Sequence, residues 1–133
     1  MSSLKYSDGT RHSQNEGLIA YAGSGCKFNI YSGTQPANAN TAITTQTLIV
    51  SLPIPGVFGT DVNGTLTLGS VTSTQASTTG IANFFRVFKA DGTTVVMDGS
   101  VGTSSADLIL DTTVINITET VNISGGTIIR ANQ

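Results

Sequence analysis

The sequence predicts an all-β domain, an antiparallel β-sandwich or jelly roll of about eight strands with a short N-terminal helix. Short runs alternate apolar and polar residues, which is the period of a half-buried strand. Gly, Asn, Asp and Pro separate these runs roughly every 8–12 residues, the spacing of sandwiches and barrels. The 133 residues fit one domain, with an N-terminal arm and helix at residues 1–23 and a β core at residues 24–133.

The clearest pair of strands lies in residues 84–104. Two runs rich in aromatic and β-branched residues flank Asp91-Gly92, a dipeptide that can take up the positive φ angles of a tight hairpin turn. The first strand, residues 81–89, is apolar on both faces, so we expect it in the centre of a sheet covered on both sides. The second, residues 95–101, should return antiparallel to it.

Residues 8–23 are the segment with helical character. Asp8 or Ser13 can cap its N-terminus, and Gly23 suits a left-handed C-terminal stop. Its apolar face would consist of Leu18, Ile19, Tyr21 and Ala22. Such a helix can close one end of the β structure or act as an arm that reaches a neighbouring subunit.

The other strands are short runs between turns and polar loops. Pro53 and Pro55 should end the second run, because proline cannot donate to a ladder. Asn63-Gly64 marks a turn, and the alternation after it places Leu66 and Leu68 on one buried face. Loops are expected at residues 34–45, 57–63 and 72–80. The expected strands are residues 27–31, 46–52, 65–71, 81–89, 95–101, 106–110, 114–117 and 121–123 with 128–129.

The composition favours a protein that assembles with others. Charged residues make up 11% of the chain, against about a quarter in average proteins. A surface solvated by Ser and Thr hydroxyls costs less to desolvate than an ionic one. The net charge of −2 and the scattered Lys and Arg predict no nucleic-acid partner. The absence of a long apolar run or a secretory signal predicts no membrane partner and synthesis in a cytoplasm.

No set of residues predicts a reaction centre, so we do not expect an enzyme, a cofactor or a metal site. His12, the single histidine, is interpreted as a surface or capping side chain, because a catalytic triad needs much more. The single cysteine, Cys26, excludes an internal disulfide and is interpreted as a small buried hydrophobe. Asp98 with Asp107 or Asp111 is the only acidic grouping dense enough for a carboxylate pair or a hard cation, and Asp at strand ends usually makes turns.

Interface candidates come from chain ends and long loops, which carry function more often than strands do. Phe58, in the loop at residues 57–63, is the best single anchor, because an aromatic between Gly56 and Gly59 has little local core to enter. Arg86 interrupts an apolar strand, so it either pairs with a carboxylate such as Asp98 across the hairpin or reaches a partner. The full set is Tyr6, Pro36, Phe58, Arg86 and Arg130.

Four segments resemble a group of small virion proteins encoded by tailed bacteriophages, in the same order along the chain and after an Arg-containing helix. They are residues 30–37 (Ile-Tyr-Ser-Gly-Thr-Gln-Pro-Ala), 80–86 (Gly-Ile-Ala-Asn-Phe-Phe-Arg), 98–104 (Asp-Gly-Ser-Val-Gly-Thr-Ser) and 106–111 (Ala-Asp-Leu-Ile-Leu-Asp). The resemblance covers most of the chain. It departs at residues 116–120, which replace the usual glycine-containing turn before the last strands.

The resemblance implies a capsid decoration or cement protein: an all-β module, dimeric or trimeric, that clamps neighbouring major capsid proteins on the outside of the virion shell after assembly in the host cytoplasm. Many symmetric copies would each add a modest binding free energy against the pressure of packaged DNA. The alternative is a tail, neck or head-fibre component with an immunoglobulin-like fold. Copy number separates the two, because cement proteins are far more numerous in a virion.

Overall fold

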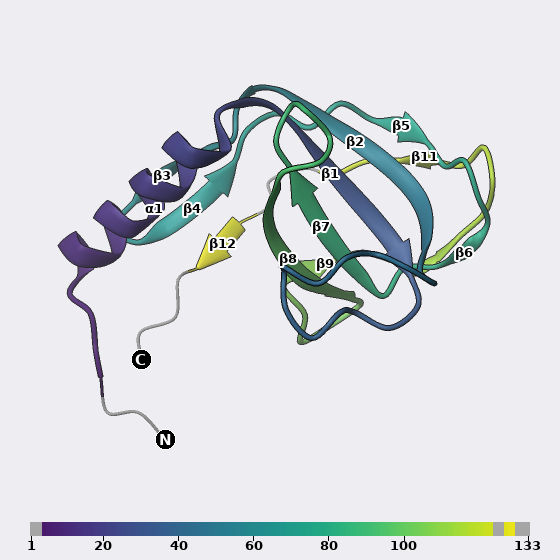
Figure 1. The fold of residues 1–133 in the computed structure, drawn as a ribbon, viewed down its shortest axis with the longest axis horizontal. Helices are drawn as coiled ribbons and strands as arrows, with labels where there is room; N and C mark the ends of the chain where they lie inside the picture. The colour runs from purple at the N-terminus through teal and green to yellow at the C-terminus, as the bar shows by residue number, and fades with distance from the viewer. Residues whose placement is uncertain (1–3, 124–126, 130–133) are drawn as a thin grey trace.

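The computed structural model describes residues 4–123 and the strand at 127–129. It is β-rich, with 42% of the residues in strands and one helix in this part of the chain, which confirms the predicted class at that level (Figure 1). Where about eight strands were expected, the described residues form twelve, several of them very short. The elements are α1 (Asp8–Ala22), β1 (Ser24–Ser32), β2 (Thr47–Val57), β3 (Gly59–Val62), β4 (Thr65–Leu68), β5 (Thr74–Gln75), β6 (Gly80–Ile81), β7 (Phe84–Phe88), β8 (Val95–Gly102), β9 (Leu108–Ile109), β10 (Val114–Ile115), β11 (Thr120–Val121) and β12 (Thr127–Ile129).

The helix lies where the sequence predicts it, but a different residue caps it. The Ser7 hydroxyl, rather than Asp8 or Ser13, accepts a hydrogen bond from the N–H three residues on. Gly23 ends the helix with φ 71°, as predicted, and its N–H donates back to the Ile19 carbonyl. Among the helical residues only Asn15 and Ala22 are buried. The helix is therefore held by polar as well as apolar contacts.

A five-stranded sheet in the order β2-β1-β7-β8-β9 forms the main body. β7 lies between β1 and β8 and pairs antiparallel with both, which confirms its predicted central place and the predicted hairpin. The last pair, β8 with β9, is parallel rather than antiparallel, with Val101 opposite Leu108 and Gly102 opposite Ile109. Two further short antiparallel pairs, β10 with β6 and β11 with β5, complete the same body.

The prolines do not end the second strand, contrary to the prediction. β2 continues through Pro53 and Pro55 and pairs with β1 along its length. The missing N–H groups are tolerated because β2 is the edge strand of its sheet. The expected loop at residues 57–63 is likewise mostly strand, since β3 forms a hairpin with β4. The Asn63-Gly64 turn is confirmed, with φ 52° and 91° at the two residues.

The Asp91-Gly92 turn joins β7 and β8 by a longer loop than a two-residue turn. Gly92 has φ 74°, but Asp91 is outside the left-handed region. The Asp91 carboxylate instead accepts the N–H groups of Thr93 and Thr94 at 2.9 and 2.8 Å and the Thr94 hydroxyl at 2.5 Å. These hydrogen bonds hold the pKa of Asp91 down at about 2.

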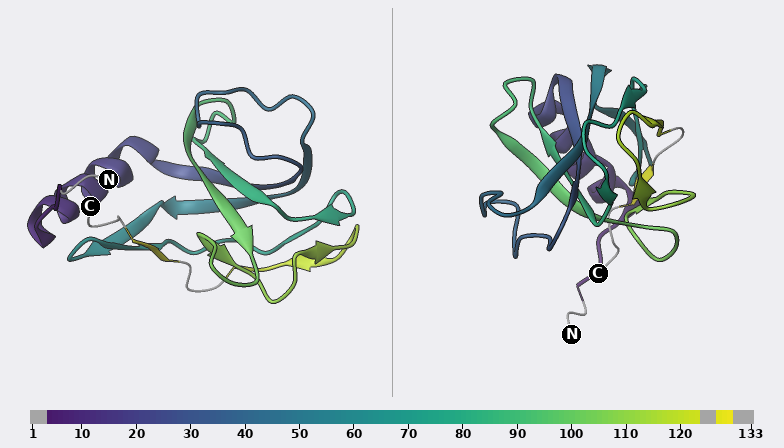
Figure 2. Two further views of the ribbon diagram at one scale, coloured as in Figure 1. Left: turned by 90° about the horizontal axis from the view of Figure 1, so that it is seen from below. Right: turned by 90° about the vertical axis from the view of Figure 1, so that its right-hand side faces the viewer.

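One apolar core joins the inner face of the sheet to the short strands and the end of α1. Phe28 and Phe85 stack within it at 4.5 Å between ring centroids, and buried residues of β10 and β11 belong to the same cluster. Leu66 is fully buried, as predicted, and Leu68 packs against the core while remaining half-buried. α1, β3 and β4 extend to one end of the molecule, and β5, β6 and β11 lie at the other (Figures 1 and 2).

Candidate functional site

The five predicted interface residues do not come together on one surface. Tyr6 and Pro36 are half-buried, in the segment before α1 and in the loop after β1. Phe58 and Arg86 are buried, and Arg130 lies outside the described residues. The interface has to be located from other features of the structure.

Phe58 is a core residue, so its prediction as an exposed anchor is wrong. Its side chain is 0% exposed and belongs to the same cluster as Leu66. The residue lies between β2 and β3, where its carbonyl accepts the N–H of Gly69 at 2.8 Å. The flanking glycines leave little local core, but Phe58 joins the apolar cluster that also contains residues of β1, β2 and β7.

Arg86 is buried with its partner, which confirms pairing across the hairpin and excludes a direct surface contact. The side chain is 2% exposed. Its Nε and Nη2 atoms donate to the two carboxylate oxygens of Asp98 at 2.6 and 2.9 Å. The hydrogen bond to Asp98 raises the pKa of Arg86, against the opposite effect of burial. The guanidinium is therefore a fixed internal charge.

This ion pair belongs to a polar row that crosses the outer face of the sheet. Arg86 lies opposite Asn29 on β1, and Asn29 lies opposite Ser51 on β2. The loop at residues 34–45, which has no strand or helix as predicted, reaches over the row, and Arg86 Nη2 lies 3.5 Å from the Asn38 carbonyl. Arg86 is thus a positioning residue for the loop that contains Pro36.

A second buried charge joins α1 to the β3–β4 hairpin, and sequence reasoning missed it. The Asp61 side chain on β3 is 0% exposed, while that of His12 is 46% exposed. Asp61 accepts hydrogen bonds from His12 Nδ1 at 2.6 Å, from Asn15 Nδ2 at 2.5 Å and from the N–H of Gly64 at 3.1 Å. Asn15 Nδ2 also donates to the Gly64 carbonyl. His12 therefore fastens the helix to the hairpin instead of capping the helix.

The electrostatics of this cluster favour an ionised Asp61. Burial acts to raise the pKa of its carboxyl, but the hydrogen bonds from Asn15, His12 and Gly64 outweigh burial and leave the pKa below its ordinary value. An aspartate that orients a histidine is also found in catalytic triads, where the histidine serves a nucleophile. The described residues place no serine, threonine or cysteine in hydrogen-bond contact with His12. The arrangement is suited to holding α1.

Of the other candidate catalytic groups, Asp98, Asp107 and Cys26 are engaged in the fold, and Asp111 lines a pocket. Asp98 is bound to Arg86, and Asp107 accepts the N–H and hydroxyl of Ser100 at 2.9 and 3.1 Å. Cys26 is buried, as predicted, and burial raises the pKa of its thiol. Within residues 4–123 and 127–129, no three His, Cys, Asp or Glu side chains are grouped closely enough to hold a metal ion. In the same part of the chain, no helix has the length and apolarity to cross a lipid bilayer.

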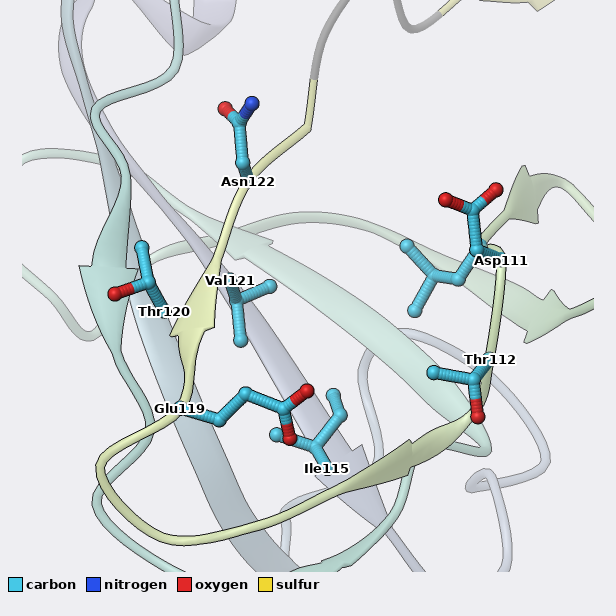
Figure 3. Close-up of a pocket in the computed structure, with 8 residues that line it drawn as sticks. Asp111, Thr112, Ile115, Glu119, Thr120, Val121 and Asn122 are labelled. Atoms are coloured by element: carbon cyan, nitrogen blue, oxygen red, sulfur yellow. The ribbon is translucent and has the colours of Figure 1, made fainter.

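A pocket of about 160 Å³ lies beside β10 and β11 (Figure 3). Asp111 and Thr112 stand on one side of it and Thr120 to Asn122 on the other, with Ile115 below. The Glu119 carboxylate is held in place because its Oε2 accepts the N–H of Asn116 at 2.8 Å. The lining residues are Leu110, Asp111, Thr112, Ile115, Glu119, Thr120, Val121 and Asn122. The lining therefore combines apolar side chains with two carboxylates.

Aliphatic side chains are exposed at both ends of the molecule and also at Leu4, at Leu48 on β2 and at Ile109 on β9. Near α1 they are Val57, opposite the start of β1, and Val62, beside the Asn63-Gly64 turn. At the other end they are Ile81 and Val114, which are direct partners on β6 and β10, and Ile117 in the following turn. Exposed aliphatic residues that gather at defined places on a surface commonly mark contacts with other proteins.

Comparisons with known proteins found no matching family model, no matching curated protein and no matching solved structure. Function is therefore inferred from the fold, from the exposed aliphatic side chains and from the segments at residues 30–37, 80–86, 98–104 and 106–111.

Proposed function

We propose that this chain is a structural virion protein that decorates or cements a tailed-phage capsid by bridging neighbouring major capsid proteins on the outer surface. The observation that carries the proposal is the exposure of aliphatic side chains at two opposite ends of the molecule. A bridging protein needs two separate contact surfaces on one stiff body. Val57 and Val62 belong to one such surface, and Ile81, Val114 and Ile117 to the other.

The body between the two ends is suited to transmitting load. β7 pairs on both sides with long strands, and the Arg86–Asp98 ion pair locks β7 to β8. At the α1 end, the buried Asp61 fastens the helix to the hairpin through three hydrogen bonds. The sheet and the α1 end are therefore held by internal interactions that do not depend on a partner.

We further propose that the fold is a sandwich or jelly roll whose first layer is the five-stranded sheet. The second layer would be built from the short strands, because Ile115 of β10 and Val121 of β11 share the core with Phe28 and Phe85 of the sheet. A dimer or trimer on the shell would place several such units at one symmetry axis, where each weak contact is multiplied.

Co-sedimentation with phage particles tests the function. Purified protein should pellet with virions that lack it and stay in the supernatant without them. Quantitative mass spectrometry of complete virions should then count hundreds of copies, as expected of a protein that lies between neighbouring major capsid proteins over the whole shell. A dozen copies or fewer would instead assign the chain to the tail, neck or head fibres. Failure to bind any particle would contradict both assignments.

A further inference from the structure

We infer that α1 is a hinged latch, which opens and closes as one unit while the five-stranded sheet stays folded. Asp61 holds the latch shut, and Cys26 lies beneath its last turn. The open form is a minor state in equilibrium with the closed structure described above. The inference does not rest on the proposed function, because it concerns contacts within this chain alone.

Few apolar contacts attach α1 to the rest of the molecule. Among its 15 residues only Asn15 and Ala22 are buried, and Leu18 and Ile19 pack half-buried against the core. By contrast, β7 buries four of its five residues. Apolar burial supplies most of the free energy that holds an element in place. The helix is therefore held less firmly than the centre of the sheet.

The polar groups of α1 are incompletely matched. Asp61 accepts hydrogen bonds from His12 and Asn15. Two other polar atoms of the helix, Arg11 Nε and Gln14 Oε1, are buried and have no hydrogen-bond partner in the part of the chain that the structure describes. A buried polar atom without a partner has lost its hydration and gained nothing in exchange. Opening returns both atoms to water, which offsets part of the cost of separating Asp61 from its partners.

The helix has little tendency to persist once it leaves the body of the molecule. Gly9 and Gly17 lie inside it, and glycine is among the poorest helix formers. Isolated helices of about 15 residues are marginal in water even when their sequences favour helix. Opening should therefore also melt α1, which frees its backbone N–H groups for exchange with solvent.

Two glycines form the hinge at the C-terminal end of α1. Gly23 and Gly25 flank Ser24 and have φ angles of 71° and 80°. Glycine enters and leaves this left-handed region at little cost, so the backbone can rotate here. A Cβ atom on Gly23 would meet nothing within 4 Å, so no described residue from elsewhere in the chain crowds the hinge.

Cys26 provides a chemical reporter of opening. It is the single cysteine of the chain, and its side chain is 0% exposed. Its thiol donates to the carbonyl of Ala22, in the last turn of α1, at 3.2 Å. When α1 leaves, this carbonyl leaves with it, and the thiol becomes accessible to a thiol reagent.

Hydrogen exchange of the native protein, followed by NMR, tests the latch without any substitution. We expect the amides of Leu18 and Ile19 to show about tenfold lower protection, or less still, than those of Phe85 and Val87 in β7. Exchange in α1 should also depend more weakly on added urea, because opening exposes less surface than global unfolding does. Equal protection and equal urea dependence in α1 and β7 would overturn the inference, because α1 would then open only when the whole chain unfolds.

Two substitutions separate opening of the latch from unfolding of the sheet. Asp61→Asn weakens the closed state relative to the open one, so labelling of Cys26 by a low concentration of thiol reagent should become about tenfold faster. Arg86→Lys weakens the sheet in the closed and open forms alike. It should lower the protection of the β7 amides and leave the labelling rate of Cys26 unchanged. The matched control is Glu16→Gln, an exposed carboxylate on α1, which should label like the wild type.

Each outcome decides the inference. Labelling that rises in Arg86→Lys by the same factor as the protection of β7 falls would show that Cys26 reacts only after global unfolding, and the latch would be wrong. Unchanged labelling in Asp61→Asn would show that Asp61 does not hold α1. If Asp61→Asn does not fold, Asn15→Ala, which removes one of the hydrogen bonds to Asp61, takes its place with the same expected direction. None of these results changes the co-sedimentation test of the proposed function.

Discussion

Arg86 and Asp98 form an ion pair whose side chains are 2% and 5% exposed, so each charge depends on the other. Arg86→Met would leave Asp98 ionised and nearly buried without a cation. We expect a loss of about 3–5 kcal/mol in the free energy of unfolding, the usual result of breaking a buried pair. Urea unfolding at neutral pH measures this loss.

Arg86→Lys provides the matched comparison. Lysine keeps the charge but cannot donate to both Asp98 oxygens in the geometry of a guanidinium. Arg86→Lys should lose less free energy of unfolding than Arg86→Met, and this loss should still be measurable. If Arg86→Met unfolded within about 1 kcal/mol of the wild type, the pair would behave like a solvated surface pair, and the structural assignment would be wrong.

Asp61 should make the stability of the protein depend on pH. Its pKa is lower in the folded chain than in the unfolded chain, where it is about 3.9. The ionised carboxylate therefore contributes stability above that value, and this contribution is lost as the pH falls through the folded pKa. Asp61→Asn should be less stable than the wild type at neutral pH. The difference in the free energy of unfolding between the two proteins, measured by urea unfolding, should narrow as the pH is lowered from about 5 to about 2.

The difference in the free energy of unfolding between the wild type and Asp61→Asn contains its own control. Other carboxyl groups, including Asp91 with its pKa of about 2, titrate in both proteins and cancel in the difference. A gap between wild type and Asp61→Asn that stays constant with pH would show that the Asp61 pKa is not lowered by folding.

At the scale of the elements, the β7–β8 hairpin depends on one glycine. Gly99 is the register partner of Phe85, and a Cβ atom on Gly99 would overlap the Phe85 ring, which is packed in the core. Gly99→Ala should cost about 1–3 kcal/mol in the free energy of unfolding, the range for overpacked cores. Gly56→Ala, in β2, is the control, because nothing lies within 4 Å of its added Cβ. Equal stability of the two variants would contradict the hairpin register.

The elements that sequence reasoning located are those with strong local signals. The helix, β1, β7 and β8 follow from their capping and hydrophobic patterns, and Asn63-Gly64 marks a turn with the expected φ angles. The course of β2 through two prolines could not be predicted, because it depends on β2 being an edge strand, which is a property of the sheet. The two-residue strands carry too few residues for any pattern.

The candidate site was predictable only in part, for the same reason. Arg86 and Asp98 face each other across a local hairpin, so their pairing could be proposed from the sequence. The sequence predicted an exposed Phe58 because the residues beside it are glycines. Its burial comes from the core cluster, whose members lie elsewhere in the chain. His12 and Asp61 are separated by 49 positions, and no motif links them. The apolar surface of Ile81 and Val114 likewise arises from a pairing between distant segments.

At the scale of the whole molecule, two exposed aliphatic ends are joined by one body with a continuous core. Among the described residues, Asp111 and Glu119 near β10 and β11 form no ion pair, and neither does the exposed Glu16 on α1, whereas Asp61 at the α1 end is bound to His12 and Asn15. A molecule built in this way can contact two different surfaces in a fixed orientation, which a bridge between neighbouring shell subunits requires.

Cryo-electron microscopy of the complete virion tests bridging most directly. We expect density for this fold on the outer surface of the shell, across the boundary between neighbouring major capsid proteins, with its two ends in contact with different subunits. Density confined to the tail or neck, or a molecule that touches a single subunit through one end only, would contradict the proposed bridge.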